Sequence, residues 1–135
     1  MRENDGKHLP EQYRDRFISR TQDECANSKI LPSQMTQLMD ELYSPDKTSE
    51  LYAPLIWSSG HKDLPRTYTQ VCGIDPSRDE NLIFADMLQN EGVPVKVELY
   101  KGLPHGFWTV LPQLPQSEQW REDTVNGFKW MLEKS

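Results

Sequence analysis

The 135-residue sequence predicts an α/β fold centred on one β-α-β unit, for three reasons. Segments 67–73 and 95–100 have the β-branched composition or the alternating polarity of strands. The segment between them has apolar residues at helical spacing, and so does the closing segment 117–132. Strands joined through one helix run parallel, so this order of elements predicts a parallel pair of strands with helices packed on it.

The first half of the chain, residues 1–60, is polar and is expected to be mostly helical. Ser33 is a suitable N-cap, because its hydroxyl can accept a hydrogen bond from a free N–H of the first turn. Pro45 disfavours the α conformation at Ser44, so the helix should end there. A shorter helix is expected after Pro10. Apolar residues at helical spacing support both helices: Tyr13, Phe17 and Ile18 in the first, and Met35, Leu38, Met39 and Leu42 in the second.

The second half follows residues 60–66, where glycine, proline and charged residues interrupt the regular patterns. The strand predicted at 67–73 is followed by Ser77 and Glu80, in the S-x-x-E order of a capping box. A helix should begin there and stop at Gly92, because glycine readily takes the left-handed conformation after a helix. The expected apolar side of this helix consists of Leu82, Ile83, Met87 and Leu88.

The next strand can start at Val95, directly after Pro94. Apolar and polar residues alternate from there to Tyr100, which predicts a strand with one wetter face, suited to the edge of a sheet. The closing helix, about 117–132, should bury one face. The strand alternates Val95, Val97 and Leu99 with Lys96, Glu98 and Tyr100, and the helix has Trp120, Thr124, Phe128, Met131 and Leu132 on its apolar face.

Composition argues against several kinds of partner. Fifteen basic and 21 acidic residues give a net charge of −6 without a Lys/Arg cluster, so nucleic acid is not expected to bind. No stretch approaches the roughly 20 apolar residues of a membrane span, and the first 20 residues have no secretory apolar region, which favours a soluble, cytoplasmic protein. The spacing of Cys25 and Cys72 indicates neither a metal site nor a redox pair, and Cys72 is expected to be a small buried residue. No cofactor is expected.

Polar loops follow both predicted strands. Asp75 lies in the loop 73–79, and His105 lies in the loop 101–107. The carboxyl ends of parallel strands lie at one edge of a sheet, where α/β proteins bind ligands, so the two side chains should meet. An imidazole can move protons near neutral pH, and a carboxylate on its other nitrogen fixes its tautomer. From spacing alone, Asp75 could equally be a turn residue, and for His105 spacing alone favours a surface loop histidine.

Residues 64–108, LPRTYTQVCGIDPSRDENLIFADMLQNEGVPVKVELYKGLPHGFW, resemble the C-terminal portion of the α/β-hydrolase fold-3 family, the hormone-sensitive-lipase-like esterases and lipases. In that family the motif D-P-L-x-D carries the acid of a catalytic triad, and H-G-F carries the histidine. The resemblance implies that Asp75 is the triad acid and His105 the general base. Ser77 stands where the family has leucine, a change that helix capping should tolerate.

The same resemblance implies a division into a helical cap-like or connecting segment, 1–60, and the C-terminal part of the hydrolase domain, 61–135, with an incomplete sheet. A small-molecule ester would bind beside the triad pair. The expected supporting residues are Phe107 and Trp108, as core or pocket wall, and Arg78 and Asp79, as a structural ion pair in the first helical turn.

The family's nucleophile elbow, G-x-S-x-G, and its HGGG-type oxyanion loop do not occur in these 135 residues. Both precede the acid in α/β-hydrolases, so we expect a truncated carboxylic-ester hydrolase that supplies the acid and base and is inactive alone. The alternative is a non-catalytic binding or regulatory fragment that pairs with a protein partner at its open strand edge. A third hypothesis makes Ser58 or Ser59 the nucleophile, although neither is expected on a strand-to-helix elbow.

Overall fold

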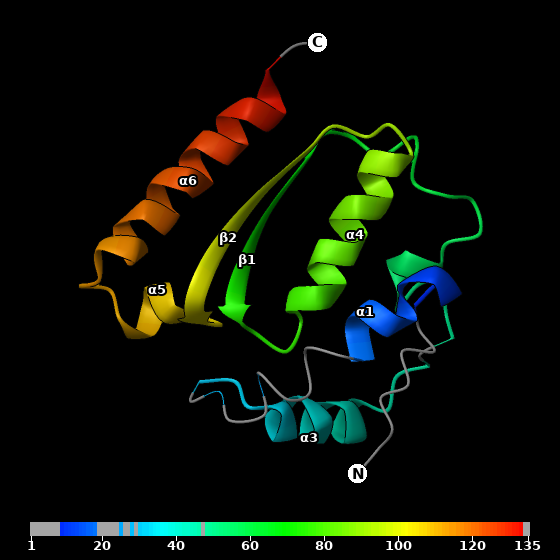
Figure 1. Cartoon of the computed structure of the whole chain (residues 1–135), viewed down its shortest axis with the longest axis horizontal. Helices are drawn as coiled ribbons and strands as arrows, with labels where there is room; N and C mark the ends of the chain where they lie inside the picture. Colours follow the sequence, from blue (N-terminus) through cyan, green and yellow to red (C-terminus); the bar gives the residue numbers. More distant parts are fainter. Residues whose placement is uncertain (1–8, 19–24, 26–27, 29, 47, 134–135) are drawn as a thin grey trace.

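The computed structural model describes residues 9–18, 25, 28, 30–46 and 48–133. The elements are η1 (Glu11–Tyr13), α1 (Arg14–Ile18), α3 (Ser33–Tyr43), η2 (Pro54–Ile56), β1 (Thr67–Ile74), α4 (Arg78–Asn90), β2 (Val95–Pro104), α5 (Phe107–Val110) and α6 (Pro115–Leu132). Two strands form the centre, with α4 on one side and α6 on the other (Figure 1). The short α5 connects β2 to α6, and α1 packs on the far side of α4.

The described residues contain one sheet, in which β1 and β2 are parallel. Pairing runs in step until Cys72 lies opposite Tyr100, and it resumes after an irregularity with Ile74 opposite Pro104. The α/β class and the parallel order predicted from the sequence are therefore confirmed. β2 is longer than the predicted segment 95–100, because pairing resumes beyond the irregularity.

α4 begins at Arg78, where a helix was expected, but a capping box does not start it. The Ser77 side chain makes no capping hydrogen bond. Its backbone N–H donates instead to Asp75 Oδ1 at 2.8 Å, an Asx turn that leads the chain from β1 into the helix. The capping-box prediction is wrong, because Asp75 takes the N–H that the box would use. α4 ends at Asn90, and Gly92 follows with a φ of 86°, as predicted for the stop.

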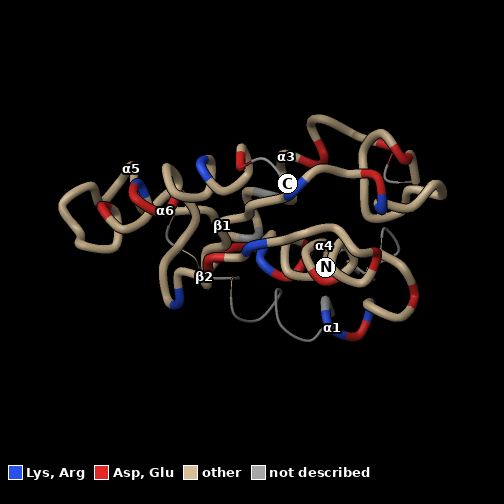
Figure 2. Tube along the Cα trace, turned by 90° about the horizontal axis from the view of Figure 1, so that it is seen from above, with Lys and Arg blue, Asp and Glu red and all other residues tan. Residues whose placement is uncertain are grey.

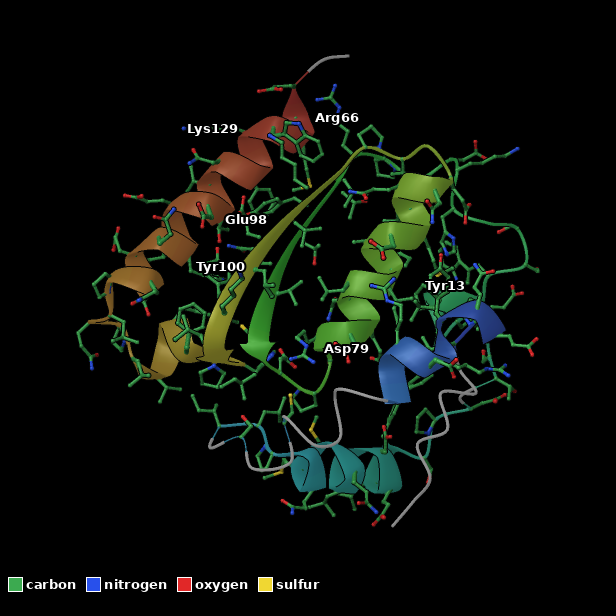
Figure 3. The ribbon with its side chains drawn as sticks, in the orientation of Figure 1. Tyr13, Arg66, Asp79, Glu98, Tyr100 and Lys129 are labelled. Atoms are coloured by element: carbon green, nitrogen blue, oxygen red, sulfur yellow. The ribbon has the colours of Figure 1, made fainter. Side chains whose placement is uncertain are left out.

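A hydrophobic cluster joins α4 to the N-terminal segment. Tyr13 lies beside α4 (Figure 3), and its hydroxyl accepts a hydrogen bond from Asn90 Nδ2 at 3.4 Å. The expectation that Tyr13 is buried is confirmed, whereas the side chains of Phe17 and Ile18 lie outside the described ones. The cluster consists of Leu9, Tyr13 and Ile83, with Leu55 and Met87 packed against it.

α3 spans Ser33–Tyr43, so its extent agrees with the sequence but its start does not. Ser33 is the first helical residue rather than the N-cap, and Pro32 occupies the cap position. The helix stops as expected, with Ser44 in the left-handed conformation at a φ of 45°. Its predicted apolar face is exposed in this chain: Met35, Leu38, Met39 and Leu42 are each at least 46% exposed.

α6 packs close to β1 at a glycine. Gly127 is buried, and a Cβ added to it would lie 2.2 Å from a ring carbon of Tyr68. The apolar face predicted from the sequence is wrong at its C-terminal end, since Phe128 is 58% and Leu132 80% exposed. The helix approaches the sheet on the side of Gly127. Phe128 follows about 100° further around the helix axis and therefore points outward.

Around Tyr100 of β2, the face that the sequence predicted to be exposed to solvent is the buried face. Tyr100 is 8% exposed and Leu99 is 40% exposed, the reverse of the predicted alternation. Tyr100 lies between β2 and α6 (Figure 3), where its hydroxyl donates to Asp123 Oδ2 at 2.8 Å and accepts from Gln70 Nε2 at 2.9 Å. Burial raises the pKa of Tyr100 above its usual range, so the hydroxyl remains a donor.

His61 joins the connecting segment to the end of α4. The side chain is 1% exposed, and its Nδ1 lies 2.9 Å from Glu91 Oε1 while Nε2 lies 2.6 Å from the Pro54 carbonyl oxygen. The His61 backbone N–H also donates to the Glu91 carboxylate. Burial by itself lowers the pKa of His61, but the contacts with Glu91 and Pro54 outweigh it and raise the pKa. An imidazolium, with two N–H donors, fits two oxygen acceptors.

Charge is distributed over the described part of the chain without separation by sign. Lys and Arg positions are interspersed with Asp and Glu positions along the trace (Figure 2). Within this part of the chain no helix combines the length and apolar character needed to cross a membrane.

Candidate active site

Asp75 and His105 meet at the carboxyl ends of β1 and β2. His105 Nδ1 lies 2.7 Å from Asp75 Oδ2, at hydrogen-bond distance. The Asp75 side chain is 8% exposed, whereas that of His105 is 51% exposed. Among the described residues no hydrogen bond involves His105 Nε2, so this nitrogen is available to a further group. The structure thus brings the two residues together as the parallel order predicted, and their catalytic roles stay a prediction.

A tight turn presents His105. β2 continues to Pro104 and α5 begins at Phe107, so only His105 and Gly106 lie between the two elements. The loop predicted over 101–107 is therefore much shorter than expected. Gly106 has a φ of 74°, a left-handed conformation that glycine adopts without strain, and it reverses the chain directly after the histidine.

Backbone groups and one arginine hold the start of α4 beneath Asp75. The Asp75 carbonyl accepts the Arg78 N–H at 3.0 Å. The Arg78 guanidinium donates from Nη1 to the Gly73 carbonyl at 2.9 Å and from Nε to Asp79 Oδ1 at 2.8 Å. Asp79, at the first turn of α4 (Figure 3), is 7% exposed. The predicted structural ion pair is confirmed, and it ties the end of β1 to the helix that follows.

The two aromatic residues after His105 have different positions. Phe107 is fully buried and packs against Tyr100 at 5.4 Å between ring centroids, so it supports the turn from the core instead of lining a pocket. Trp108 is half-buried, and its ring meets the His105 ring at 5.9 Å with the planes at 61°. Trp108 also stacks on Trp120 of α6 at 4.4 Å, with the rings nearly parallel.

Trp120 is the site neighbour that the sequence did not reveal. Its position on the predicted apolar face of the closing helix assigned it to the core. A tryptophan at helical spacing gives no sign of which aromatic ring it will meet, because its partner is on another element. The aromatic triplet in this chain, His105, Trp108 and Trp120, is therefore a property of the folded structure.

Cys72 lies below the same edge of the sheet and is 4% exposed, as its apolar surroundings predicted. Burial, with a smaller contribution from the negative charge of Asp75, raises the pKa of the Cys72 thiol to about 11. The nucleophilic form of cysteine is the thiolate, so this residue stays protonated and unreactive near neutral pH. Among the described residues, no group of three or more His, Cys, Asp or Glu side chains has an arrangement that could hold a metal ion.

Fold and site together define an α/β protein with a carboxylate–imidazole pair at the carboxyl edge of a parallel sheet. Ligands of α/β proteins bind at this edge. The chain belongs to the α/β hydrolase fold family, which matches residues 9–109. The family membership inferred from the D-P-S-R-D and H-G-F segments is thereby confirmed.

Relatives support the same assignment. An AB hydrolase superfamily protein of Schizosaccharomyces pombe is 34% identical over 113 residues, which are 84% of this chain and 33% of that protein. The versiconal hemiacetal acetate esterase of Dothistroma septosporum is 28% identical, over 92% of this chain and 37% of the esterase. The crystal structure of vibralactone cyclase superposes with a TM-score of 0.84 at 27% identity, over 92% of this chain and 36% of the cyclase. The chain therefore spans about a third of the length of these relatives.

Proposed function

We propose that the chain supplies the acid and base of a serine hydrolase that cleaves carboxylic esters. The contact between His105 Nδ1 and Asp75 Oδ2, at 2.7 Å, supports this function most directly. With the proton held on Nδ1, Nε2 carries the lone pair that accepts the proton of an attacking hydroxyl. The Asp75 carboxylate stabilises the imidazolium that forms, and Nε2 then returns the proton to the leaving alcohol.

The nucleophile and the oxyanion hole would come from a segment other than these 135 residues. The sequence contains no G-x-S-x-G or HGGG motif, and the order of the triad in α/β-hydrolases is serine, then acid, then histidine. The printed name of the esterase relative supports an ester as the substrate class. Without its nucleophile and oxyanion hole the pair would activate nothing, so we expect the isolated chain to be almost inactive.

A chimera tests the two roles. Residues 9–135 replace the corresponding C-terminal third of a family esterase that keeps its own nucleophile elbow, and hydrolysis of p-nitrophenyl acetate is measured. We expect His105→Gln and Asp75→Asn to lower kcat/KM by about 10⁴-fold or more, the usual effect of removing a triad member. Asp63→Asn, an exposed carboxylate in the connecting turn, should leave kcat/KM unchanged.

Two outcomes would contradict the proposal. One is a folded, active chimera whose kcat/KM is unaffected by His105→Gln, because His105 would then not be the base. The other is ester turnover and fluorophosphonate labelling by the isolated 135-residue chain. Turnover of that kind would place the nucleophile within the chain, with Ser58 and Ser59 as the residues to replace first.

A further inference from the structure

The pair with Asp75 does not by itself fix the His105 ring. The imidazole is held at one atom, Nδ1, while its side chain is 51% exposed. A ring with a single hydrogen bond can leave its partner by rotating about the side-chain bonds. Solvent on the open side then offers competing hydrogen bonds. A second contact is needed if Nδ1 is to remain directed at the carboxylate.

Trp108 provides that contact. Its ring and the imidazole form a T-shaped pair, with centroids 5.9 Å apart and planes at 61°. This geometry is among those that aromatic pairs prefer, because the positive edge of one ring meets the negative face of the other. The contact and the Asp75 hydrogen bond together restrain the His105 ring at two places.

α5 cannot hold Trp108 without help, because it consists of only four residues and helices of this length are not stable alone. Trp120 of α6 supplies the support. The two indoles are stacked at 4.4 Å with planes 3° apart, and Phe107 meets the Trp108 ring at 5.5 Å and 81°. Trp108 is thus enclosed between a long helix and a fully buried phenylalanine.

The sheet in turn fixes the helix that carries Trp120. Gln70 on β1 donates to the Trp120 carbonyl at 3.0 Å, and Thr124 donates to Gln70 Oε1 at 2.9 Å. Tyr100 on β2 donates to Asp123 on the same helix at 2.8 Å. A continuous set of contacts therefore runs from both strands through α6 and the stacked indoles to the imidazole.

We propose that Trp108, supported by Trp120, is a positioning residue that holds the His105 imidazole in the orientation and tautomer selected by Asp75. Its importance for ester hydrolysis rests on the proposed function, but the orientation of the ring can be measured without any turnover.

The experiment uses the 135-residue chain labelled with ¹⁵N. Long-range ¹⁵N–¹H spectra in alkaline solution, where neutral histidine rings predominate, report which ring nitrogen of each histidine carries the proton. His105→Gln identifies the His105 signals, and Asp75→Asn gives the ratio of tautomers without the carboxylate. Trp108→Ala, Trp120→Ala, the conservative Trp108→Phe and the exposed α5 control Val110→Ala are then compared.

The wild-type His105 ring should carry its proton mainly on Nδ1. Trp108→Ala should lower the ratio of Nδ1–H to Nε2–H by roughly 2- to 10-fold, the range expected from losing one aromatic contact. Trp120→Ala should lower it less, and Trp108→Phe and Val110→Ala should leave it near the wild-type value. The His61 ring, which shares none of these contacts, is an internal reference: general loosening of the fold would change it as well.

An unchanged His105 ratio in Trp108→Ala would overturn the proposal, and so would an equal change at His61. An Asp75→Asn variant with the wild-type ratio would overturn both the pair and its positioning. Failure of the proposed function has a different signature. The chimera would be inactive or independent of His105, while the tautomer of His105 would still respond to Trp108.

Discussion

Replacing Gly73 by alanine should separate the two strands directly beneath the site. A Cβ at this position would lie 2.7 Å from the Gly102 backbone nitrogen and 3.0 Å from Lys101 Cα, well inside the 3.4 Å at which ordinary van der Waals contact begins. Both atoms belong to the backbone of β2, so no side-chain rotation can relieve the overlap. The strands must part instead, and Asp75 and His105 lie two and three residues beyond the contact.

Two opposing effects set the size of the change. Overpacking of this kind costs about 1–3 kcal/mol. Alanine in a strand regains about 0.5–1 kcal/mol relative to glycine, because the unfolded chain has less freedom to lose. The overlap with backbone atoms places the cost at about 2–3 kcal/mol, so Gly73→Ala should destabilise the chain by about 1–2.5 kcal/mol. For a chain of this size we expect Tm to fall by about 3–10 °C.

Thermal unfolding followed by circular dichroism measures the stability, and the imidazole ¹⁵N spectrum measures the site. The matched control is Gly92→Ala. An added Cβ there has open space around it, but the φ of 86° makes any side chain strained. Both variants should lose stability, and only Gly73→Ala should shift the His105 signals toward those of Asp75→Asn. A Gly73→Ala protein with an unchanged or higher Tm and wild-type His105 signals would refute the reasoning.

Two further variants test the packing elsewhere. Gly127→Ala gains about 1 kcal/mol of helix propensity, but its Cβ would lie 2.2 Å from the Tyr68 ring. Urea unfolding should therefore show a net loss of about 1–2 kcal/mol in the free energy of unfolding. The control Asn126→Ala, at an exposed position of the same helix, should show a small gain. A net gain for Gly127→Ala would contradict the close packing. The pKa of His61 is higher in the folded chain than its unfolded value of about 6.5, so protonation of His61 stabilises the fold. This stabilisation is complete below about pH 6.5 and disappears as the pH rises through the folded pKa. Tm measured from pH 6 upward should therefore fall more in wild type than in His61→Gln; parallel curves would argue against a charged His61–Glu91 contact.

Local patterns predicted the elements well where neighbours in the chain determine them. Alternating polarity located β2, and Gly92 correctly marked the end of α4, because a left-handed residue is a local requirement. The order strand, helix, strand also predicted that the residues after the two strands would meet. Asp75 and His105 are 30 positions apart, and their contact follows from that topology together with the motifs around them.

Predictions failed where burial depends on which element covers a face. Alternation marked Tyr100 as a residue of the wetter face, but α6 packs over that side and buries it. Helical spacing placed Phe128 on the inner face of α6, but the helix approaches β1 through Gly127. The S-x-x-E pattern failed because Asp75, outside the pattern, had already taken the Ser77 N–H.

The sequence alone determined the fold class and the family resemblance, and it predicted the acid–base pair, because each follows from residue order and motifs within one continuous stretch. Only the tertiary structure decided how that pair is held. The stacking of Trp108 on Trp120 and the closeness of Gly73 to β2 join separate elements at distances of a few ångströms. Such contacts depend on how the elements pack, and no spacing along the chain records them.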